Sequence, residues 1–196
     1  MYEAVVIGVS VGGLAALRAI LPRLPADFPM PIAIVQHVAE GAGTHLPELL
    51  DRHCAIAVKE ADEKERLAPA TAYLAPAGYH LLVEPDGTFG LSADQRVNFC
   101  CPSIDVLFET AADVFADRLV GIILTGANGD GAKGLKAVKS RGGLAVVQDP
   151  EGAEAWFMPQ AALAEVEPDF VADLDGIARL LIELGQPEGG VKSHVA

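Results

Sequence analysis

Short apolar segments alternate with glycine-rich turns and helical segments over the first third of the chain, and this alternation is the strongest constraint on the fold. Glu3–Val9 contains the run Ala-Val-Val-Ile and is followed by a glycine-rich turn and a helical segment from Leu14 to about Leu21. A second apolar run, Ile32–Gln36, precedes a helical segment around Thr44–Arg52. Uniformly apolar strands separated by helices are typical of a parallel sheet buried on both faces. The sequence therefore predicts an α/β fold with a doubly wound, mostly parallel sheet and helices on both faces.

The middle of the chain departs from this alternation. Strand-like segments at Thr71–Ala75 and His80–Glu84 are followed by the turn Pro85–Thr88 and by Phe89–Leu91. This pattern predicts an antiparallel hairpin near one edge of the sheet. Helical segments and apolar strands then alternate again over Ser103–Phe115, Leu119–Leu124, Ala132–Ser140, Leu144–Val147 and Asp173–Leu184. We expect one domain over residues 1–184 and a flexible tail over residues 185–196.

The composition restricts the partners and the compartment. The net charge of −13 at pH 7 would repel a phosphate backbone, so nucleic acid is not an expected partner. Apolar runs such as Leu119–Leu124 are much shorter than the ~20 residues that span a bilayer, and no signal peptide pattern opens the chain. The three cysteines do not suggest a disulfide framework, which fits a reducing compartment. We expect a soluble, cytoplasmic protein with no direct membrane insertion.

Three polar loops follow three of the apolar strands and carry Ser10, His37 and Asp130. Since the carboxyl ends of parallel strands lie along one edge of a sheet, these loops can converge there. A serine, a histidine and a carboxylate are the groups that a Ser-His-Asp hydrolase requires. The serine lies in Gly8-Val-Ser-Val-Gly12, which matches the G-x-S-x-G turn that exposes a nucleophile between a strand and a helix.

Each of these residues also has an ordinary structural interpretation. Ser10 could cap the helix that begins near Leu14, or its turn could bind a dinucleotide, although a serine stands where G-x-G-x-x-G has its second glycine. A histidine at the end of a buried strand is often a packing residue, and His45 remains a competitor for the role of base. Asp130 could be the N-cap of the helix that follows it. The motif alone leaves these interpretations open.

A metal site is not expected. His53-Cys54 and Cys100-Cys101 are adjacent pairs and lack the C-x-x-C or H-x-x-x-H spacing of zinc ligands. Lys133 follows Asp130 in a glycine-rich stretch, but the chain has no G-x-x-x-x-G-K-[ST] phosphate loop.

Six segments in chain order carry a family resemblance. They are Gly8–Gly13, Val35–Val38, Tyr73–His80, Pro102–Phe108, Leu124–Gly131 and Gln148–Ala162. Together they resemble the signature segments of the chemotaxis receptor methylesterases, the CheB family, over about residues 3–184. Six segments in the same order are much more specific than G-x-S-x-G alone.

The resemblance implies a Rossmann-like domain with Ser10 as nucleophile, His37 as base and Asp130 as the carboxylate that orients it. It implies hydrolysis of glutamate methyl esters on the cytoplasmic helices of methyl-accepting chemotaxis receptors, with release of methanol, and in some members deamidation of receptor glutamines. The backbone N–H groups of Val11 and Ala127 would hold the oxyanion. No metal or organic cofactor is implied.

The sequence departs from the family pattern at four places. Val11 replaces a residue that is usually polar, and Ala127–Gly129 replaces the usual Met-Gly-x before the aspartate. Cys101 replaces an arginine before Pro-Ser, and Phe157 replaces a common glycine before Met-Pro. Because an arginine at the site could recognise an acidic receptor helix, its absence bears on the substrate more than on the triad.

Two alternatives to a receptor methylesterase remain open at this point. One is an esterase or amidase with another substrate, and the other is a catalytically weak regulatory or binding module of the same fold. Full-length members of the family usually carry an N-terminal receiver domain, whereas the first strand here begins at Glu3. We therefore expect a stand-alone or trimmed catalytic domain, on which a receiver-domain protein could act in trans.

Overall fold

The computed structural model describes residues 1–37 and 45–186, and its centre is a seven-stranded sheet. The strand order is β3-β4-β2-β1-β7-β8-β9, and all neighbouring strands are parallel. The strands of this sheet are β1 (Ala4–Val9), β2 (Ile32–Gln36), β3 (Ala57–Glu60), β4 (Thr71–Leu74), β7 (Leu119–Ile123), β8 (Leu144–Gln148) and β9 (Phe170–Ala172). The α-helices are α1 (Gly13–Ile20), α2 (Leu46–Asp51), α3 (Ile104–Phe115), α4 (Ala132–Ser140), α5 (Phe157–Glu165) and α6 (Leu174–Leu184). Three short 3-10 turns lie at Leu21–Arg23, Ala116–Arg118 and Pro150–Gly152.

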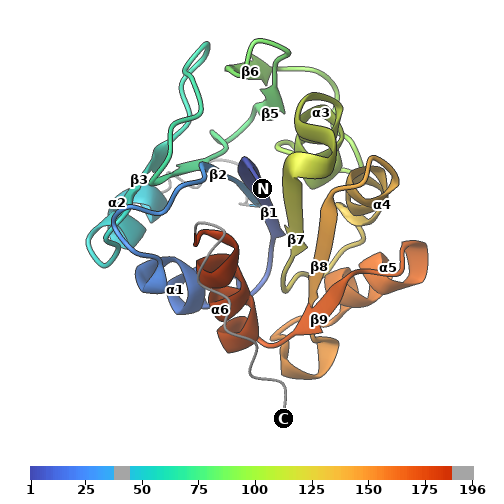
Figure 1. Ribbon diagram of the computed structural model, residues 1–196. Helices are drawn as coiled ribbons and strands as arrows, with labels where there is room; N and C mark the ends of the chain where they lie inside the picture. The colour runs from blue at the N-terminus through green and yellow to red at the C-terminus, as the bar shows by residue number, and fades with distance from the viewer. Residues whose placement is uncertain (38–44, 187–196) are drawn as a thin grey trace.

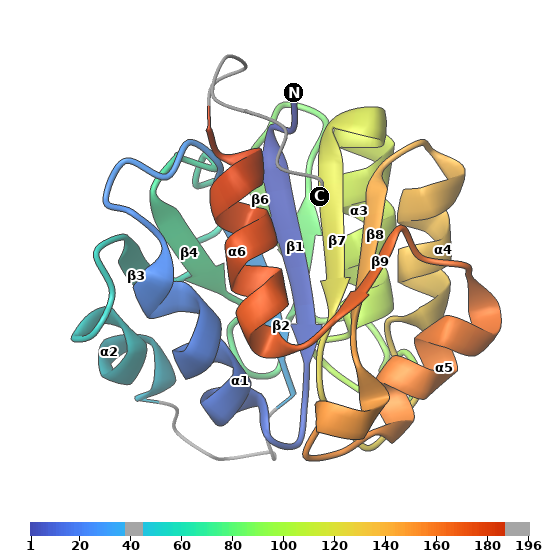
Figure 2. The same ribbon diagram turned by 60° about the horizontal axis from the view of Figure 1, so that its bottom comes forward.

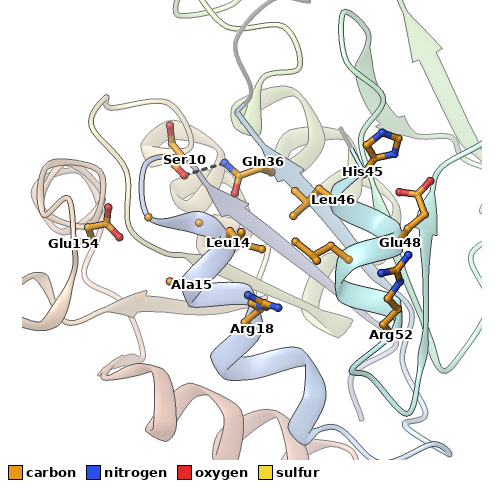
Figure 3. Close-up of a pocket in the computed structure, with 13 residues that line it drawn as sticks. Ser10, Leu14, Ala15, Arg18, Gln36, His45, Leu46, Glu48, Arg52 and Glu154 are labelled. Atoms are coloured by element: carbon orange, nitrogen blue, oxygen red, sulfur yellow. Dashed lines mark hydrogen bonds between the residues drawn. The ribbon is translucent and has the colours of Figure 1, made fainter. Parts of the chain in front are cut away.

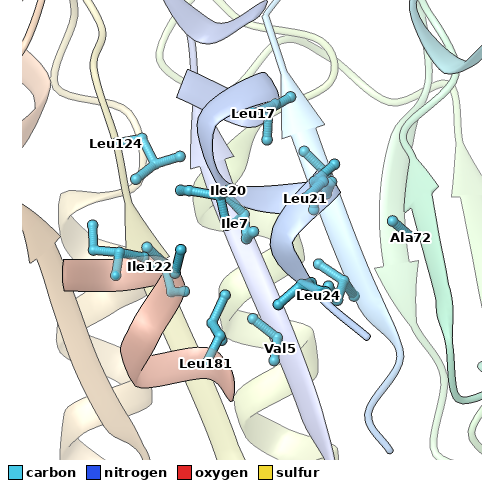
Figure 4. Packing of buried hydrophobic residues seen from close by; sticks show 14 of the residues in the cluster. Val5, Ile7, Leu17, Ile20, Leu21, Leu24, Ala72, Ile122, Leu124 and Leu181 are labelled. Atoms are coloured by element: carbon cyan, nitrogen blue, oxygen red, sulfur yellow. The ribbon is translucent and has the colours of Figure 1, made fainter. Parts of the chain in front are cut away.

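Helices cover both faces of the sheet (Figure 1), with α1 and α6 on one face and α3 and α4 on the other (Figure 2). Alternate residues of β1 contribute to two separate hydrophobic clusters. Val5 and Ile7 pack against the first pair of helices, as Figure 4 shows, whereas Ala4 and Val6 belong to the second cluster. Both faces of the central strand are thus buried, which is why its sequence shows no polar alternation. The predicted doubly wound, mostly parallel α/β fold is confirmed.

The predicted hairpin also forms, but as a sheet of its own. β5 (His80–Val83) and β6 (Phe89–Ser92) pair antiparallel in a two-stranded sheet that packs on α3 instead of extending the main sheet. The Val83 N–H donates a hydrogen bond to Oγ1 of Thr110 in α3 (3.1 Å). The other middle strand, β4, lies inside the parallel sheet between β3 and β2.

Several elements differ from the expectations. The edge strands β3 and β9 and the helix α5 were not predicted; the two strands are only four and three residues long and partly exposed, so they carry no apolar run. The described part of the second helix covers only Leu46–Asp51, and Thr44 lies outside the described residues. Most of the expected tail, residues 187–196, also lies outside them. Within the described residues, no helix is both long and apolar enough to cross a bilayer.

Candidate active site

Ser10 directly follows β1, which lies between β2 and β7 at the centre of the sheet. The strand register pairs Val9 with Gln36, and the N–H of His37 donates to the Val9 carbonyl (3.0 Å). The N–H of Ser10 donates to the carbonyl of Thr125, just beyond β7 (2.9 Å). Ser10 therefore lies between the loops that follow the two neighbouring strands, at the point where an open α/β sheet binds its ligands.

The structure explains why two positions of the G-x-S-x-G turn are glycines. A Cβ atom on Gly8 would lie 2.3 Å from Cγ2 of Ile104, so the glycine allows the start of α3 to pack directly against β1. Gly12 has φ +80°, a conformation that favours glycine, and it is the N-cap of α1. No side chain caps α1 in the structure. The interpretation of Ser10 as the cap of this helix is therefore wrong.

His37 and Asp130 meet although they are 93 residues apart, with His37 Nε2 and Asp130 Oδ2 separated by 2.9 Å. The carboxylate is fully buried and the imidazole is 11% exposed. Asp130 is not the N-cap of the helix that follows it, because Gly131 occupies that position. Among the hydrogen bonds of the described residues, none joins Ser10 Oγ to His37. Ser10 and His37 nevertheless directly follow Val9 and Gln36, which are paired in the neighbouring strands β1 and β2.

The Asp130 carboxylate is held at the N-terminus of α3. It accepts hydrogen bonds from the N–H of Ile104 (2.6 Å), from Ser103 Oγ (2.8 Å) and from Asn98 Nδ2 (2.8 Å). Burial alone would raise the pKa of Asp130, but the hydrogen bonds from His37, Asn98, Ile104 and Ser103 outweigh it and lower the pKa below its ordinary value. Asp130 is thus a buried anion whose charge is stabilised by a helix end and a set of donors.

A second buried carboxylate completes this arrangement. Asp105, in the first turn of α3, accepts hydrogen bonds from the N–H groups of Gly131 (3.0 Å) and Gly134 (2.7 Å) at the start of α4. Asn98 Nδ2 donates to Asp105 (2.7 Å) as well as to Asp130. Burial raises the pKa of Asp105, against the hydrogen bond from Gly134, and the charge of Asp130 adds to the rise. Asp130, from the loop before α4, therefore caps α3, and Asp105, from α3, caps α4.

The other ring nitrogen of His37 faces away from Asp130. Asn128 Nδ2 lies 3.4 Å and Cys100 Sγ 3.9 Å from His37 Nδ1. Because Nε2–H donates to Asp130, Nδ1 is the nitrogen that is available to accept a proton. Burial lowers the pKa of His37, but the hydrogen bonds and charges of Asp130 and Cys100 outweigh it and raise the pKa from 6.5 to about 9.

A glutamine fixes the two loops relative to each other. The side-chain amide of Gln36 donates to the backbone carbonyls of Ser10 and His37, both at 2.9 Å. Gln36 also covers Gly13, where a Cβ atom would lie 1.8 Å from its Oε1. The side chain therefore holds the serine turn and the histidine loop at a set distance from one another.

Of the two predicted oxyanion donors, Val11 directly follows Ser10 in the serine turn, and Ala127 lies in the loop between β7 and α4. Among the hydrogen bonds of the described residues, none is made by the N–H of Val11 or of Ala127. Thr125 Oγ1 donates to the Val11 carbonyl (2.8 Å), and the N–H of Gly126 donates to Ala155 (2.9 Å), so the backbone around both groups is fixed. Two fixed and unused N–H groups beside a serine are what an oxyanion hole needs.

The remaining histidines have different positions. His80 is buried, accepts a hydrogen bond from the N–H of Ser103 at Nδ1 (3.1 Å), and lies 3.2 Å from the Gln95 carbonyl through Nε2. It therefore supports the start of α3. His53 is exposed, and His45 is exposed at the start of α2, where it lines the pocket beside Ser10. His194 lies outside the described residues.

A groove of about 860 Å³ runs from Ser10 between α1 and α2 (Figure 3). Leu14 and Leu46 line its middle, and Arg18 and Arg52 lie toward the end away from Ser10. Neither arginine forms an ion pair with another described residue. The groove therefore offers an apolar surface and two cations to a substrate that reaches Ser10.

Sequence reasoning missed the groups that support the pair. Ser103 and Asp105 lie within a segment that carries the family resemblance, but no role was assigned to them. Gln36 lies within another of these segments and was also given no role. Asn98 was not singled out, and no pattern could have identified it, because its partners are brought together only by the packing of α3 against α4.

Comparisons with known proteins agree with this site and fold. The family model described as CheB methylesterase matches residues 5–181. The chain is 53% identical to a Leptospira interrogans protein described as a candidate protein-glutamate methylesterase/protein-glutamine glutaminase, over 94% of this chain and 96% of that protein. It is 38% identical to the protein-glutamate methylesterase FrzG of Myxococcus xanthus, over 93% of this chain and 54% of that protein.

A solved structure gives the same result. The catalytic domain of the Thermotoga maritima CheB methylesterase is 35% identical, with a TM-score of 0.90 over 94% of this chain and 99% of that domain. The chain belongs to the CheB methylesterase family.

Proposed function

We propose that this chain is a serine hydrolase that removes methyl groups from glutamate esters, and ammonia from glutamines, on the cytoplasmic helices of chemotaxis receptors. The observation that carries the proposal is the hydrogen-bonded His37–Asp130 pair beside Ser10 at the centre of the sheet. Membership of the CheB methylesterase family supports it, as do relatives named for both reactions.

In the proposed mechanism, Ser10 Oγ attacks the ester carbonyl while His37 Nδ1 takes its proton. The Nε2–H of His37 remains on Asp130, whose negative charge stabilises the imidazolium that forms. The N–H groups of Val11 and Ala127 hold the oxyanion of the tetrahedral intermediate. His37 then gives the proton to the leaving methoxide oxygen, which departs as methanol, or to the leaving nitrogen of a glutamine, which departs as ammonia. Water hydrolyses the glutamyl enzyme by the same steps in reverse order, with His37 as base.

The surroundings of the site favour a protein substrate over a small ester. Phe99 is 93% exposed, on the loop that also carries Asn98 and Cys100. Trp156 and Phe157 are about half exposed, and a Cβ atom on Gly129 would lie 3.9 Å from the Phe157 ring. Large apolar side chains that remain in water on site-forming loops are typical of surfaces that bind another macromolecule.

The experiment that tests the function compares two substrates of the purified chain. We expect it to release methanol from a methylated receptor cytoplasmic fragment, with one new carboxylate for each methanol. A small chromogenic ester such as p-nitrophenyl acetate should also be hydrolysed, with a much lower kcat/KM. Hydrolysis of the chromogenic ester without any methanol from the receptor would identify an esterase with another substrate. Hydrolysis of neither would support a regulatory module.

Phe99→Ser should weaken receptor demethylation selectively. An aromatic side chain that becomes buried at the centre of an interface can contribute ~1.4 kcal/mol, so we expect kcat/KM for the methylated receptor to fall about 10-fold. Hydrolysis of p-nitrophenyl acetate should be unchanged, because Phe99 points into solvent in the free protein. Phe170→Ser, at an exposed phenylalanine on the edge strand β9, is the matched control and should affect neither substrate. Equal losses with both substrates would mean that Phe99 supports the site instead of contacting the receptor.

A further inference from the structure

Cys100 lies in the site but has no role in the proposed mechanism. Its Sγ lies 3.9 Å from Nδ1 of His37 and is partly accessible to solvent. The amide nitrogen of Asn128 lies 3.3 Å from Cys100 Sγ and 3.4 Å from His37 Nδ1. A single donor group thus lies beside both the sulfur and the ring nitrogen, and the sulfur also donates to the Asn98 carbonyl (3.4 Å).

The separation of these two atoms suits a metal ion. In a tetrahedral zinc site the bonds are about 2.3 Å to sulfur and about 2.0 Å to nitrogen, which places the two ligand atoms roughly 3.5 Å apart. The observed 3.9 Å exceeds this value by only about 0.4 Å. Thiolate and imidazole are also the ligands that zinc and cobalt prefer.

The far side of the imidazole is arranged as it is in many metal sites. A metal-bound histidine usually donates its other N–H to a carboxylate, which fixes the orientation of the ring and raises its basicity. His37 donates Nε2–H to the buried carboxylate of Asp130 at 2.9 Å. His37 therefore presents Nδ1 to Cys100 with its tautomer already set.

We propose that Cys100 and His37 form a binding site for a thiophilic divalent cation such as Zn²⁺, and that this cation inhibits the enzyme. Binding replaces two waters of the hydrated cation by Sγ and Nδ1. The thiol releases one proton to solvent, and protonated His37 releases a second from Nδ1; no group is oxidised or reduced. The remaining coordination positions keep water, so the affinity should be far below that of a closed four-ligand site. The inhibition rests on the proposed function, because the cation occupies the lone pair that would take the proton of Ser10.

This pair could not be predicted from the sequence, because the two ligands are 63 residues apart and neither belongs to a C-x-x-C or H-x-x-x-H motif. They meet because the loop before α3 reaches the carboxyl end of β2. No metal site was expected from the sequence. The proposed cation would act as an inhibitor and not as a cofactor.

The binding test uses Co²⁺ as a spectroscopic probe and does not depend on hydrolysis. We expect the 196-residue chain, reduced and free of metal, to develop the near-ultraviolet thiolate-to-cobalt absorption with one equivalent of Co²⁺ bound, and Zn²⁺ to displace the Co²⁺. Cys100→Ser should abolish this absorption. Cys54→Ser, at a partly buried cysteine beyond α2, is the matched control and should leave it unchanged. Asn128→Asp, which adds an anionic oxygen beside both ligands, should tighten binding. No absorption with the wild-type chain, or its persistence in Cys100→Ser, would overturn the proposal.

The inhibition test measures methanol release at increasing Zn²⁺. The wild-type chain should lose activity and regain it with a chelator. Cys100→Ser, with its rate measured relative to its own metal-free rate, should need at least 10-fold more Zn²⁺ for half inhibition. Equal sensitivity of the two proteins would contradict inhibition at this site. A wild-type chain that binds cobalt but hydrolyses nothing would refute the proposed function alone, and an active chain without the cobalt absorption would refute the metal site alone.

Discussion

Replacing Ser10 with alanine is expected to reduce kcat for methanol release by at least about 10⁴-fold, as the loss of the nucleophile does in other serine hydrolases. The fold should remain, because α1 is capped at Gly12 without any side chain and the backbone bonds of residue 10 do not need the hydroxyl. We expect the free energy of unfolding to change by less than about 0.5 kcal/mol. Methanol release and urea denaturation of the same preparation measure the two effects.

A fluorophosphonate probe adds a direct chemical test. It should label the wild-type chain on the peptide that contains Ser10 and fail to label Ser10→Ala. Ser140→Ala, at an exposed serine near the end of α4, is the matched control and should keep both the labelling and the activity. If Ser10→Ala retained wild-type methanol release, another residue would have to be the nucleophile.

Asp130→Asn should have the second large effect, and it should reach both activity and stability. Each carboxylate oxygen accepts from at least two donors, among them His37 and Ile104 on one oxygen and Ser103 and Asn98 on the other. An asparagine NH₂ would meet donors in either orientation. Leaving buried donors unpaired costs ~1–3 kcal/mol, so the free energy of unfolding should fall by at least about 2 kcal/mol. The rate should fall by up to about 10⁴-fold, because His37 loses its orienting charge.

The same variant should change the pH dependence. His37 must be neutral to accept a proton, so kcat/KM of the wild-type chain should rise with pH through about 9. Removing the charge of Asp130 lowers the pKa of His37, so the rise of kcat/KM should move to lower pH.

The free energy of unfolding should depend on pH through the same group. Since the folded pKa of His37 lies above its ordinary value of 6.5, protonated His37 stabilises the fold below about pH 6.5, and this contribution is lost as pH rises through about 9.

Asp130→Asn should remove most of that stability change between pH 6.5 and 9. Denaturation curves across this range, together with pH–rate profiles, measure both shifts. A limb that stays near pH 9 in the variant would show that another partner of His37, such as Cys100, sets its pKa.

The sequence predicted the central strands well because both faces of each strand are buried. β1 and β7 consist almost entirely of buried apolar residues, a pattern that depends little on the rest of the fold. The edge strand β9 has two exposed residues out of three, and its pairing with β8 comes from backbone hydrogen bonds that any side chains allow. The hairpin was recognised from its turn, but its packing on α3 depends on tertiary contacts that the local sequence does not encode.

For the site, the sequence could indicate the loops and the types of side chain but not their contacts. Ser10, His37 and Asp130 stood out because polar residues followed buried strands at the same edge of the sheet. Asn98 lies in an irregular loop with φ +51°, and its two acceptors come from α3 and from the loop before α4. Such a residue becomes visible only once the helices are placed in space. The position of Cys100 beside His37 likewise emerges only from the structure.

The exchange of capping carboxylates between α3 and α4 has a consequence for how this enzyme can evolve. The oxygens of Asp130 that hold the imidazole of His37 also close the first turn of α3, and Asp105 closes the first turn of α4. A change that loosens the contact between these helices therefore disorients the base, even when it lies far from the substrate. Loop residues that make none of these hydrogen bonds, such as Phe99, can change to suit new receptors, whereas the helix pair and the loop residues that tie it together, such as Asn98, must vary as one unit.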